Sequence, residues 1–252
     1  MTRPVTLITG ASAGLGAEFA RQCAKRGEAL VLVARRRDRL ERLAAEIGGL
    51  PHIFVADLAE AGAAASLIAE IEAEGLSVGT LINNAGFGLA GRFSDQPLGR
   101  LDEMIDLNVR TLVDLCHFVL PAMRARGQGA ILNVASTAAF VPGPNMAVYY
   151  ASKAFVLSFT EALHHELKGT GIRVSALCPG PTESEFSEVA ESRSATLERM
   201  KRPADGVVRA GLEGLDRNKA VVVPGWPNKA TANMARFLPR ATVRRIVGNI
   251  KD

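Results

Sequence analysis

Tyr149 and Lys153 stand four residues apart, the spacing that places two side chains on one face of a helix. An isolated phenol has a pKa of about 10 and an isolated lysine a pKa of about 10.4. An ammonium group held beside the phenol favours the phenolate and so lowers the pKa of the tyrosine. We therefore expect Tyr149 to exchange a proton with a substrate oxygen near neutral pH. The alternative is an ordinary helix that carries both residues on one side.

A glycine-rich turn at residues 10–16 separates a short apolar strand, predicted at residues 5–9, from a helical pattern. This order of strand, turn and helix directs a helix N-terminus and its backbone N–H groups toward a phosphate. The spacing is G-x-x-x-G-x-G, not the commoner G-x-G-x-x-G. Dinucleotide binding is favoured over a merely flexible turn because of the flanking strand and helix. The predicted contacts are Gly10, Ser12, Ala13, Gly14, Leu15 and Gly16.

Arginines follow the second predicted strand, residues 29–34, where many dinucleotide-binding domains carry an acidic residue for the ribose 2′-hydroxyl. A carboxylate there would repel a 2′-phosphate, whereas a guanidinium group binds it through charge-assisted, often bidentate hydrogen bonds. Arg35 and Arg36 therefore predict NADP(H) rather than NAD(H) as the cofactor. A solvated basic start to the helix at residues 38–47 is the alternative, and it suits Arg37 better than Arg35.

Four further predicted strands, at residues 52–56, 80–83, 130–135 and 172–178, end in small or polar residues. Asp57, after the first of them, accepts a hydrogen bond from an adenine amine, caps the helix at residues 60–74, or does both. In a doubly wound sheet ligands bind where the strands end, so these residues are predicted to belong to one site. They are Asp57, Leu58, Asn84, Ala85, Gly86, Ser136, Pro179, Gly180 and Thr182.

Strands and helices alternate along the chain with no linker, repeat or low-complexity segment. A seventh strand is predicted at residues 220–224, after a helix at residues 204–215. We therefore predict one Rossmann-like, doubly wound α/β domain over residues 1–252, with a mostly parallel seven-stranded sheet and helices on both faces. Asn108 interrupts the apolar face of a long helical region at residues 101–126. It is either a satisfied core amide or a group that holds water.

Together these motifs resemble the short-chain dehydrogenase/reductase family, in particular its NADP-preferring 3-oxoacyl- and carbonyl-reductase-like members. The resemblance covers nearly the whole chain. It rests on residues 9–16 and 83–86 and on Asn108, Ser136, Tyr149 with Lys153, and Pro179 with Gly180. It implies a catalytic tetrad of Asn108, Ser136, Tyr149 and Lys153, of which Tyr149 and Lys153 also contact the cofactor.

The resemblance also implies a role for each member of the tetrad. Tyr149 would protonate the carbonyl oxygen, and Ser136 would donate a hydrogen bond to the same oxygen. Lys153 would hold the nicotinamide ribose and lower the pKa of Tyr149. Asn108 would anchor a water molecule that connects Lys153 to solvent. The cofactor would supply the hydride.

The implied activity is the NADPH-dependent reduction of a ketone or 3-oxoacyl-type carbonyl to an alcohol, with Tyr149 as the general acid. An NADP(H)-binding redox sensor with little turnover is the alternative. The complete tetrad favours the enzyme, because a sensor does not need Tyr149. Thr182 is expected to meet the nicotinamide carboxamide. Tyr150, three residues before Lys153, is assigned to packing.

The bulk composition excludes several other classes of protein. The formal net charge of +4, without a basic stripe interleaved with aromatic residues, does not predict nucleic-acid binding. The cysteines Cys23, Cys116 and Cys178 have no C-x-x-C spacing, so we expect neither a metal site nor a disulfide framework and favour a reducing cytoplasm. The sequence contains no run of 18 or more apolar residues, so we predict no membrane span.

Two segments near the C-terminus are expected to serve the substrate or a partner. Residues 183–202 are predicted to form a substrate lid or a plain surface helix. Residues 226–252 form a basic segment, which Pro239 divides into two short helices. One interpretation is that this segment lies on an anionic membrane or binds an acyl-carrier partner. The other, which we favour, is that it packs on the domain or on a neighbouring subunit. We expect a homodimer or homotetramer.

Overall fold

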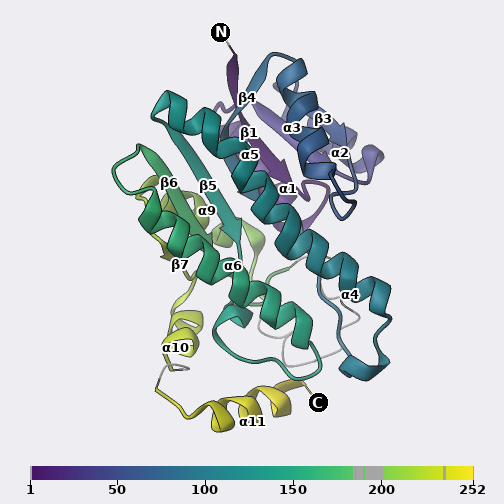
Figure 1. Ribbon diagram of the computed structural model, residues 1–252, viewed down its shortest axis with the longest axis vertical. Helices are drawn as coiled ribbons and strands as arrows, with labels where there is room; N and C mark the ends of the chain where they lie inside the picture. The colour runs from purple at the N-terminus through teal and green to yellow at the C-terminus, as the bar shows by residue number, and fades with distance from the viewer. Residues whose placement is uncertain (1, 184, 186–189, 191–200, 235–236, 252) are drawn as a thin grey trace.

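The computed structural model describes residues 2–183, 185, 190, 201–234 and 237–251, and within them the chain forms one sheet of seven strands (Figure 1). Every neighbouring pair of strands is parallel, so the sheet is wholly parallel rather than mostly so. The strands run in the order β3-β2-β1-β4-β5-β6-β7. Their bounds are β1 Arg3–Thr9, β2 Leu30–Ala34, β3 His52–Val55, β4 Leu76–Asn83, β5 Gly129–Val134, β6 Ile172–Leu177 and β7 Val221–Val222.

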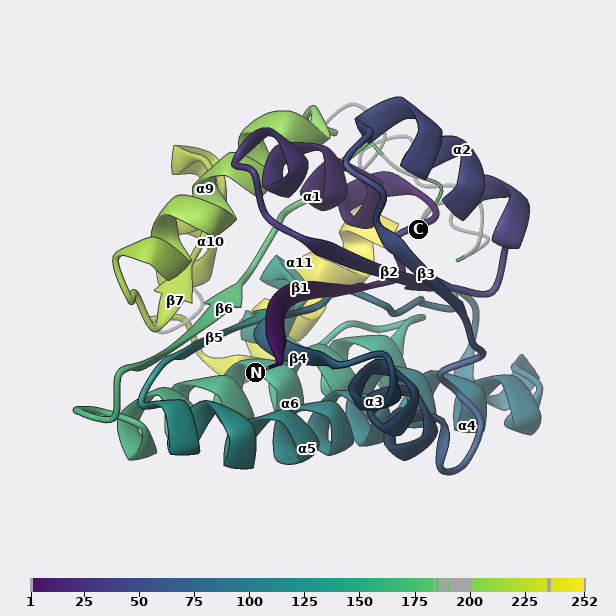
Figure 2. The same ribbon diagram turned by 90° about the horizontal axis from the view of Figure 1, so that it is seen from above.

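Helices cover both faces of the sheet, as Figure 2 shows. One face carries α1 (Gly14–Lys25), α2 (Arg37–Ile47) and α9 (Ala204–Asp216), and the other carries α3 (Ala63–Ala73), α5 (Thr111–Arg126) and α6 (Ala147–Glu166). Each face has its own buried apolar core. Side chains alternate between the two cores along a strand, so that Leu7 belongs to one and Ile8 to the other. Strands buried on both faces explain the unbroken apolar runs in the sequence.

The order of the strands reverses at the centre of the sheet. From β1 the chain proceeds to β2 and β3 on one side, whereas β4, β5, β6 and β7 follow on the other side. The connections that leave the carboxyl ends of β1 and β4 therefore diverge. Ligands of doubly wound sheets bind in the crevice at such a reversal. The glycine-rich turn after β1 and residues 84–86 after β4 both lie there.

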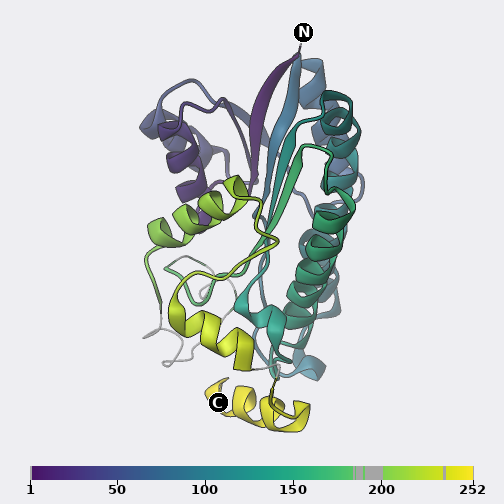
Figure 3. The same ribbon diagram turned by 90° about the vertical axis from the view of Figure 1, so that its left-hand side faces the viewer.

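The remaining helices lie near the carboxyl ends of the strands (Figures 1 and 3). They are α4 (Leu98–Ile105), the π-helix η2 (Asp106–Arg110), the 3₁₀ helices η1 (Phe93–Asp95) and η3 (Thr137–Phe140), α10 (Trp226–Met234) and α11 (Arg240–Lys251). The predicted helical region at residues 101–126 is thus α4, η2 and α5 in succession. The basic C-terminal segment forms two helices, α10 and α11, before and after Pro239. Among the described residues, none of the helices has the length and apolar character needed to cross a membrane.

Candidate active site

The turn between β1 and α1 brings backbone N–H groups to the edge of the sheet. A Cβ on Gly16 would lie 2.1 Å from the carbonyl oxygen of Gly10, so only glycine lets the helix approach the strand end this closely. Gly10 itself has φ +66°, in the left-handed region that glycine adopts most easily. Ala13 stands at the N-cap of α1 and offers no side-chain hydrogen bond, so the first N–H groups of the helix are left for water or a ligand.

Residues after β4 brace this turn. The side-chain nitrogen of Asn84 donates to the carbonyl oxygens of Thr9 at 2.9 Å and Gly10 at 3.3 Å. The Thr9 hydroxyl oxygen accepts hydrogen bonds from the backbone N–H groups of Asn84 and Ala85, each at 3.0 Å. Asn84 and Ala85 were predicted as cofactor contacts, and the structure uses them to hold the glycine-rich turn in place. Direct contact with a cofactor stays a prediction.

Basic side chains gather beside the turn, where α2 begins. The Arg36 guanidinium donates to the Ser12 hydroxyl at 3.2 Å, and Arg35 forms an exposed ion pair with Asp57 at 3.4 Å. Arg36 and Arg39 also both pair with the carboxylate of Glu185. Sequence reasoning missed Arg39, although its position three residues after Arg36 on α2 was a usable signal. It also missed Glu185, because no pattern in the sequence links this residue to Arg36 and Arg39.

Asp57 does not cap the helix that follows it. Its carboxylate accepts from the backbone N–H of Ala59 at 3.0 Å, which closes a local turn, and α3 begins only at Ala63 after the N-cap residue Gly62. The prediction of a helical cap is therefore wrong. The reason is that the short side chain of Asp57 reaches a donor two residues on, in an Asx turn. Leu58 is buried in the core, and its backbone carbonyl accepts from Thr111.

Tyr149, Lys153 and Ser136 meet where β5 and α6 approach each other. Tyr149 and Lys153 lie one turn apart on α6 and are 9% and 5% exposed. Ser136 lies two residues after the end of β5, at the N-cap of η3, and accepts from the backbone N–H of Ala138 at 3.1 Å. It also makes a hydrogen bond with the Tyr149 side chain. The structure thus brings together the phenol, the hydroxyl and the amine that the sequence placed in separate segments.

The pKa values of this group depart from the sequence-based expectation. Burial raises the pKa of Tyr149 to about 12, although its hydrogen bond with Ser136 acts in the opposite direction. Burial lowers the pKa of Lys153 to about 8. The lysine Nζ donates to the carbonyl oxygen of Val134 at 2.9 Å and lies 6.0 Å from the centre of the Tyr149 ring. The expected fall in the pKa of Tyr149 is therefore wrong for this structure, because desolvation of the phenolate outweighs the hydrogen bond with Ser136.

Asn108 lies in the π-helix η2 and is 1% exposed. Its side-chain oxygen accepts from the Phe87 backbone N–H at 3.1 Å. Its nitrogen donates to the Phe87 carbonyl at 2.9 Å and to the Ser152 hydroxyl at 3.1 Å. Of the two alternatives, the structure supports a core amide that protein groups satisfy, and the predicted water stays a prediction. A Cβ on Gly86 would lie 2.8 Å from the Asn108 side-chain oxygen and 3.4 Å from Lys153 Nζ.

The segment after β6 closes the other side of the site. The Pro179 carbonyl accepts from the backbone N–H of Thr137 at 2.8 Å, which ties this segment to the end of β5. Thr182 donates to the Gly180 carbonyl at 2.9 Å. A Cβ on Gly180 would lie 2.5 Å from the side-chain oxygen of Asn228, a contact from α10 that sequence reasoning missed. Most of the predicted lid, residues 184, 186–189 and 191–200, lies outside the described residues.

Apolar side chains surround Tyr149 on the side of α4 and the loop after β4. Leu101, Met104, Ala138 and Met146 form one buried cluster with Tyr149. Ala190 joins this cluster, and its carbonyl accepts from the backbone N–H of Ala90 at 2.8 Å. The Tyr150 ring packs edge-on against Tyr149, with centroids 5.9 Å apart, which agrees with its assignment to packing. The ring of Tyr149 is therefore packed among apolar side chains.

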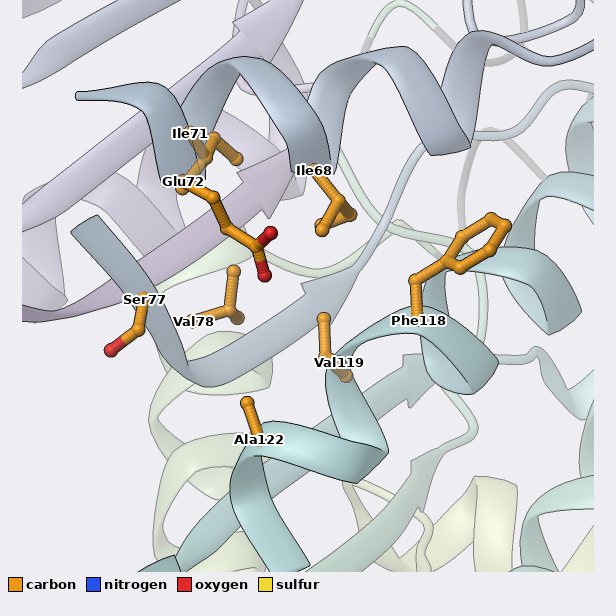
Figure 4. Close-up of a pocket in the computed structure, with 8 residues that line it drawn as sticks. All are labelled: Ile68, Ile71, Glu72, Ser77, Val78, Phe118, Val119 and Ala122. Carbon is orange, nitrogen blue, oxygen red and sulfur yellow. The ribbon is translucent and has the colours of Figure 1, made fainter. Parts of the chain in front are cut away.

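A hollow between α3, β4 and α5 is shown in Figure 4. It is lined mainly by apolar side chains together with Glu72 and Ser77, and the buried Ser77 hydroxyl has no hydrogen-bond partner. Ser77 stands at the start of β4, whereas the predicted site residues follow the ends of the strands. This hollow therefore takes no part in the candidate site.

Comparison with known proteins agrees with this geometry. A family model described as short chain dehydrogenase matches residues 4–195. Sulfoacetaldehyde reductase 2 of Chromohalobacter salexigens is 42% identical over 189 residues, 73% of this chain and 75% of the relative. The very-long-chain 3-oxoacyl-CoA reductase of Anas platyrhynchos is 35% identical over 214 residues, 80% of this chain and 68% of that protein. A short-chain dehydrogenase from Sphingobium yanoikuyae, solved in complex with NADPH, has a TM-score of 0.82 and 35% identity, covering 94% of this chain and 97% of its own.

Proposed function

Because the chain belongs to the short-chain dehydrogenase/reductase family, it is an oxidoreductase of a family that binds nicotinamide cofactors, and we propose that it reduces a ketone or 3-oxoacyl-type carbonyl to an alcohol with NADPH. One observation carries the proposal. A buried phenol with a raised pKa makes a hydrogen bond with Ser136 and stands beside Lys153 at the carboxyl edge of the sheet. A protonated phenol with a second hydroxyl donor is the arrangement that a carbonyl reduction requires.

The residues at this edge fit a nicotinamide dinucleotide. The close approach of α1 to the end of β1, which Gly16 permits, and the uncapped start of α1 suit a pyrophosphate. Arg35, Arg36 and Ser12 would hold the 2′-phosphate, since guanidinium groups bind phosphates through paired hydrogen bonds. The NADPH complex of the Sphingobium relative supports this choice of cofactor. When bound, the cofactor supplies the hydride.

Tyr149 is proposed as the proton donor. Its raised pKa keeps the phenol protonated at neutral pH, so the proton is available for the carbonyl oxygen. Ser136 already accepts a hydrogen bond from the backbone N–H of Ala138, so its own hydroxyl proton can be directed at the phenol or at the substrate oxygen. Together the two hydroxyl groups would stabilise the negative charge that develops on that oxygen.

Lys153 and Asn108 support this chemistry. With a pKa of about 8, Lys153 remains mostly protonated near neutral pH, and its charge would stabilise the phenolate left by proton transfer. Its donors would also reach the ribose of the cofactor. Asn108 acts as a positioning residue, because its bonds to Phe87 and Ser152 join the loop after β4 to the helix that carries Tyr149.

The substrate class follows from the surroundings of the phenol. Leu101, Met104 and Met146 pack with Tyr149 in one buried apolar cluster, and these surroundings of the phenol support a carbonyl compound with an apolar portion. The two relatives named above differ in the substrate that their names state, a small sulfonated aldehyde in one and a long acyl thioester in the other. The proposal therefore names the carbonyl class and no single compound.

A panel of carbonyl compounds tests the proposal. NADPH oxidation would be followed by the loss of reduced-nicotinamide absorbance with ketones, aldehydes and 3-oxoacyl thioesters. We expect turnover with at least one ketone or 3-oxoacyl thioester that has an apolar chain. An NADP(H)-binding redox sensor would instead bind NADPH and oxidise it with no member of the panel, and that result would overturn the enzyme proposal.

The same proposal extends to organisation and cellular setting. We assign residues 1–252 to one cofactor-binding domain. The cysteines Cys23, Cys116 and Cys178 are free and buried, which supports a reducing compartment such as the cytoplasm. Phe118 on α5 and Phe155 on α6 are 39% and 42% exposed, which supports a homodimer or homotetramer built on these helices. Light scattering on the purified protein would test the assembly.

A further inference from the structure

One carboxylate, that of Glu185, already binds Arg36, a residue that the proposed function assigns to the 2′-phosphate. Glu185 Oε2 accepts from both terminal nitrogens of Arg36, each at 3.0 Å, and Glu185 Oε1 accepts from Arg39. One nitrogen of Arg36 also bonds the hydroxyl of Ser12, in the glycine-rich turn, at 3.2 Å. The carboxylate therefore sits on the same guanidinium group that reaches toward the dinucleotide turn.

The site around Glu185 is built to hold an anion. Arg36 stands at the N-cap of α2 and offers no side-chain cap, so the positive end of the helix dipole adds to the charges of Arg36 and Arg39. The hydrogen bond with Arg39, followed by that with Arg36, holds the pKa of the Glu185 carboxyl below its usual range. Glu185 is thus ionised at neutral pH, and two guanidinium groups share its two oxygens.

Glu185 and the arginines come from distant parts of the chain. Glu185 follows β6 and is 146 residues from Arg39 in the sequence. Two residues earlier, the backbone N–H of Glu183 donates to the carbonyl of Arg202 at 2.9 Å, so the backbone at Glu183 has a partner other than the two arginines. The side chain of Glu185 is about one-third exposed and can leave the arginines by rotating toward solvent.

We propose that Glu185 is a resident competitor for the 2′-phosphate of the cofactor. Its carboxylate fills the anion site of Arg36 and Arg39 in the unliganded protein, and it must leave before a phosphate can bind there. This inference rests on the proposed use of NADPH. NADH has no 2′-phosphate, so it binds without displacing Glu185. Glu185 therefore makes the ratio of NADPH affinity to NADH affinity smaller than the arginines alone would produce.

The test is a binding comparison with Glu185→Gln, which keeps the shape of the side chain and removes its charge. Dissociation constants would be measured by titration calorimetry for NADPH and NADH, and for the fragments 2′,5′-ADP and 5′-AMP. We expect Glu185→Gln to bind NADPH and 2′,5′-ADP about three- to tenfold more tightly than the unaltered protein, from the loss of two partly exposed ion pairs. Binding of NADH and 5′-AMP should not change.

Glu41→Gln is the matched control. Glu41 also lies on α2 and pairs with an arginine, Arg37, at 3.7 Å, but it does not touch Arg36 or Arg39 in the described structure. It should leave all four dissociation constants unchanged. The inference is overturned if Glu185→Gln binds NADPH as the unaltered protein does or more weakly. It is equally overturned if NADPH and NADH tighten together, because that result reports general charge and not competition at one site.

An Arg36→Ala variant separates this inference from the function on which it rests. If the unaltered protein shows no preference for NADPH and Arg36→Ala does not weaken NADPH binding, the proposed cofactor itself is wrong. If the preference exists and Arg36→Ala removes it, while Glu185→Gln has no effect, only the role of Glu185 is wrong.

Discussion

The ammonium nitrogen of Lys153 lies 6.0 Å from the centre of the Tyr149 ring, on the same face of α6. It also donates a hydrogen bond to the carbonyl oxygen of Val134 at the end of β5. Both side chains are buried, and burial moves their pKa values in opposite directions, up for the phenol and down for the amine. In each case burial favours the neutral form. The pair is thus arranged so that the phenol keeps its proton until a substrate oxygen arrives.

Removing the phenol hydroxyl should stop the reaction without disturbing the fold. For Tyr149→Phe we expect kcat to fall by about a hundredfold or more, the usual contribution of a general acid. The dissociation constant for NADPH should stay nearly the same, because the aromatic ring remains. Steady-state kinetics and a fluorescence titration of NADPH would measure the two effects. Tyr150→Phe, the neighbouring phenol, should retain turnover; equal loss in both variants would mean that the acid is misassigned.

The lowered pKa of Lys153 predicts a dependence of stability on pH. Between its folded pKa of about 8 and the ordinary value of 10.5, the unfolded chain holds this proton and the folded protein does not. Stability should therefore rise with pH in that window. The measured quantity is the free energy of unfolding of the unaltered protein minus that of Lys153→Met. We expect this difference to increase by about 1 kcal/mol between pH 7 and pH 9.

The unaltered protein is compared with Lys153→Met because other buried groups also make the free energy of unfolding depend on pH. Tyr149, Tyr150 and the three cysteines have raised pKa values, so their contributions to the free energy of unfolding fall as the pH rises above about 9. All five groups are present in both proteins. Denaturant unfolding curves at pH 7, 8 and 9 would supply the measurement. A difference between the two proteins that does not vary with pH would show that Lys153 is not desolvated as the structure indicates.

A methyl group at Gly86 should disturb the positioning of Asn108. The added Cβ of Gly86→Ala would lie 2.8 Å from the Asn108 side-chain oxygen and 3.4 Å from Lys153 Nζ, so one of these groups must shift. We expect a loss of about 1–3 kcal/mol in stability, as for other overpacked sites, with a fall in kcat. Gly99→Ala on α4 is the control, since its Cβ would meet nothing within 4 Å. Equal behaviour of the two variants would contradict the prediction.

Arg36 should decide the choice between the two cofactors. Arg36→Ala is expected to raise the dissociation constant for NADPH by about tenfold or more, from the loss of a charge-assisted contact, and to leave that for NADH nearly unchanged. Arg37→Ala serves as the control, because Arg37 pairs with Glu41 on the exposed side of α2. The assignment of the 2′-phosphate to Arg36 fails if Arg37→Ala has the larger effect.

Much of the fold could be predicted because its signals are local. A strand buried on both faces of a parallel sheet reads as an unbroken apolar run, and each of the seven predicted runs overlaps a strand, although β4 begins earlier than predicted, at Leu76, and β7 spans only Val221–Val222. Helix ends were less accurate. The helix predicted at residues 60–74 begins at Ala63, since the acceptor on Asp57 closes a local turn instead. Competition of this kind between a turn and a cap depends on backbone geometry that composition does not encode.

The candidate site divides in the same way. Tyr149 and Lys153 could be paired from their spacing, because four residues make one helical turn. The direction of the Tyr149 pKa shift could not be obtained in that way. It depends on how deeply the phenol is buried, which outweighs the opposite effect of its hydrogen bond with Ser136.

The sequence by itself determined the order of the elements, the glycine-rich turn and the types of residue at the strand ends, because these properties reside in short stretches of chain. Only the tertiary structure decided which distant groups share a site. It set the Asn228 side chain against Gly180 and the Glu185 carboxylate on Arg36 and Arg39. Such contacts join segments far apart in the chain, and their energies depend on distance and burial, which exist only once the chain is folded.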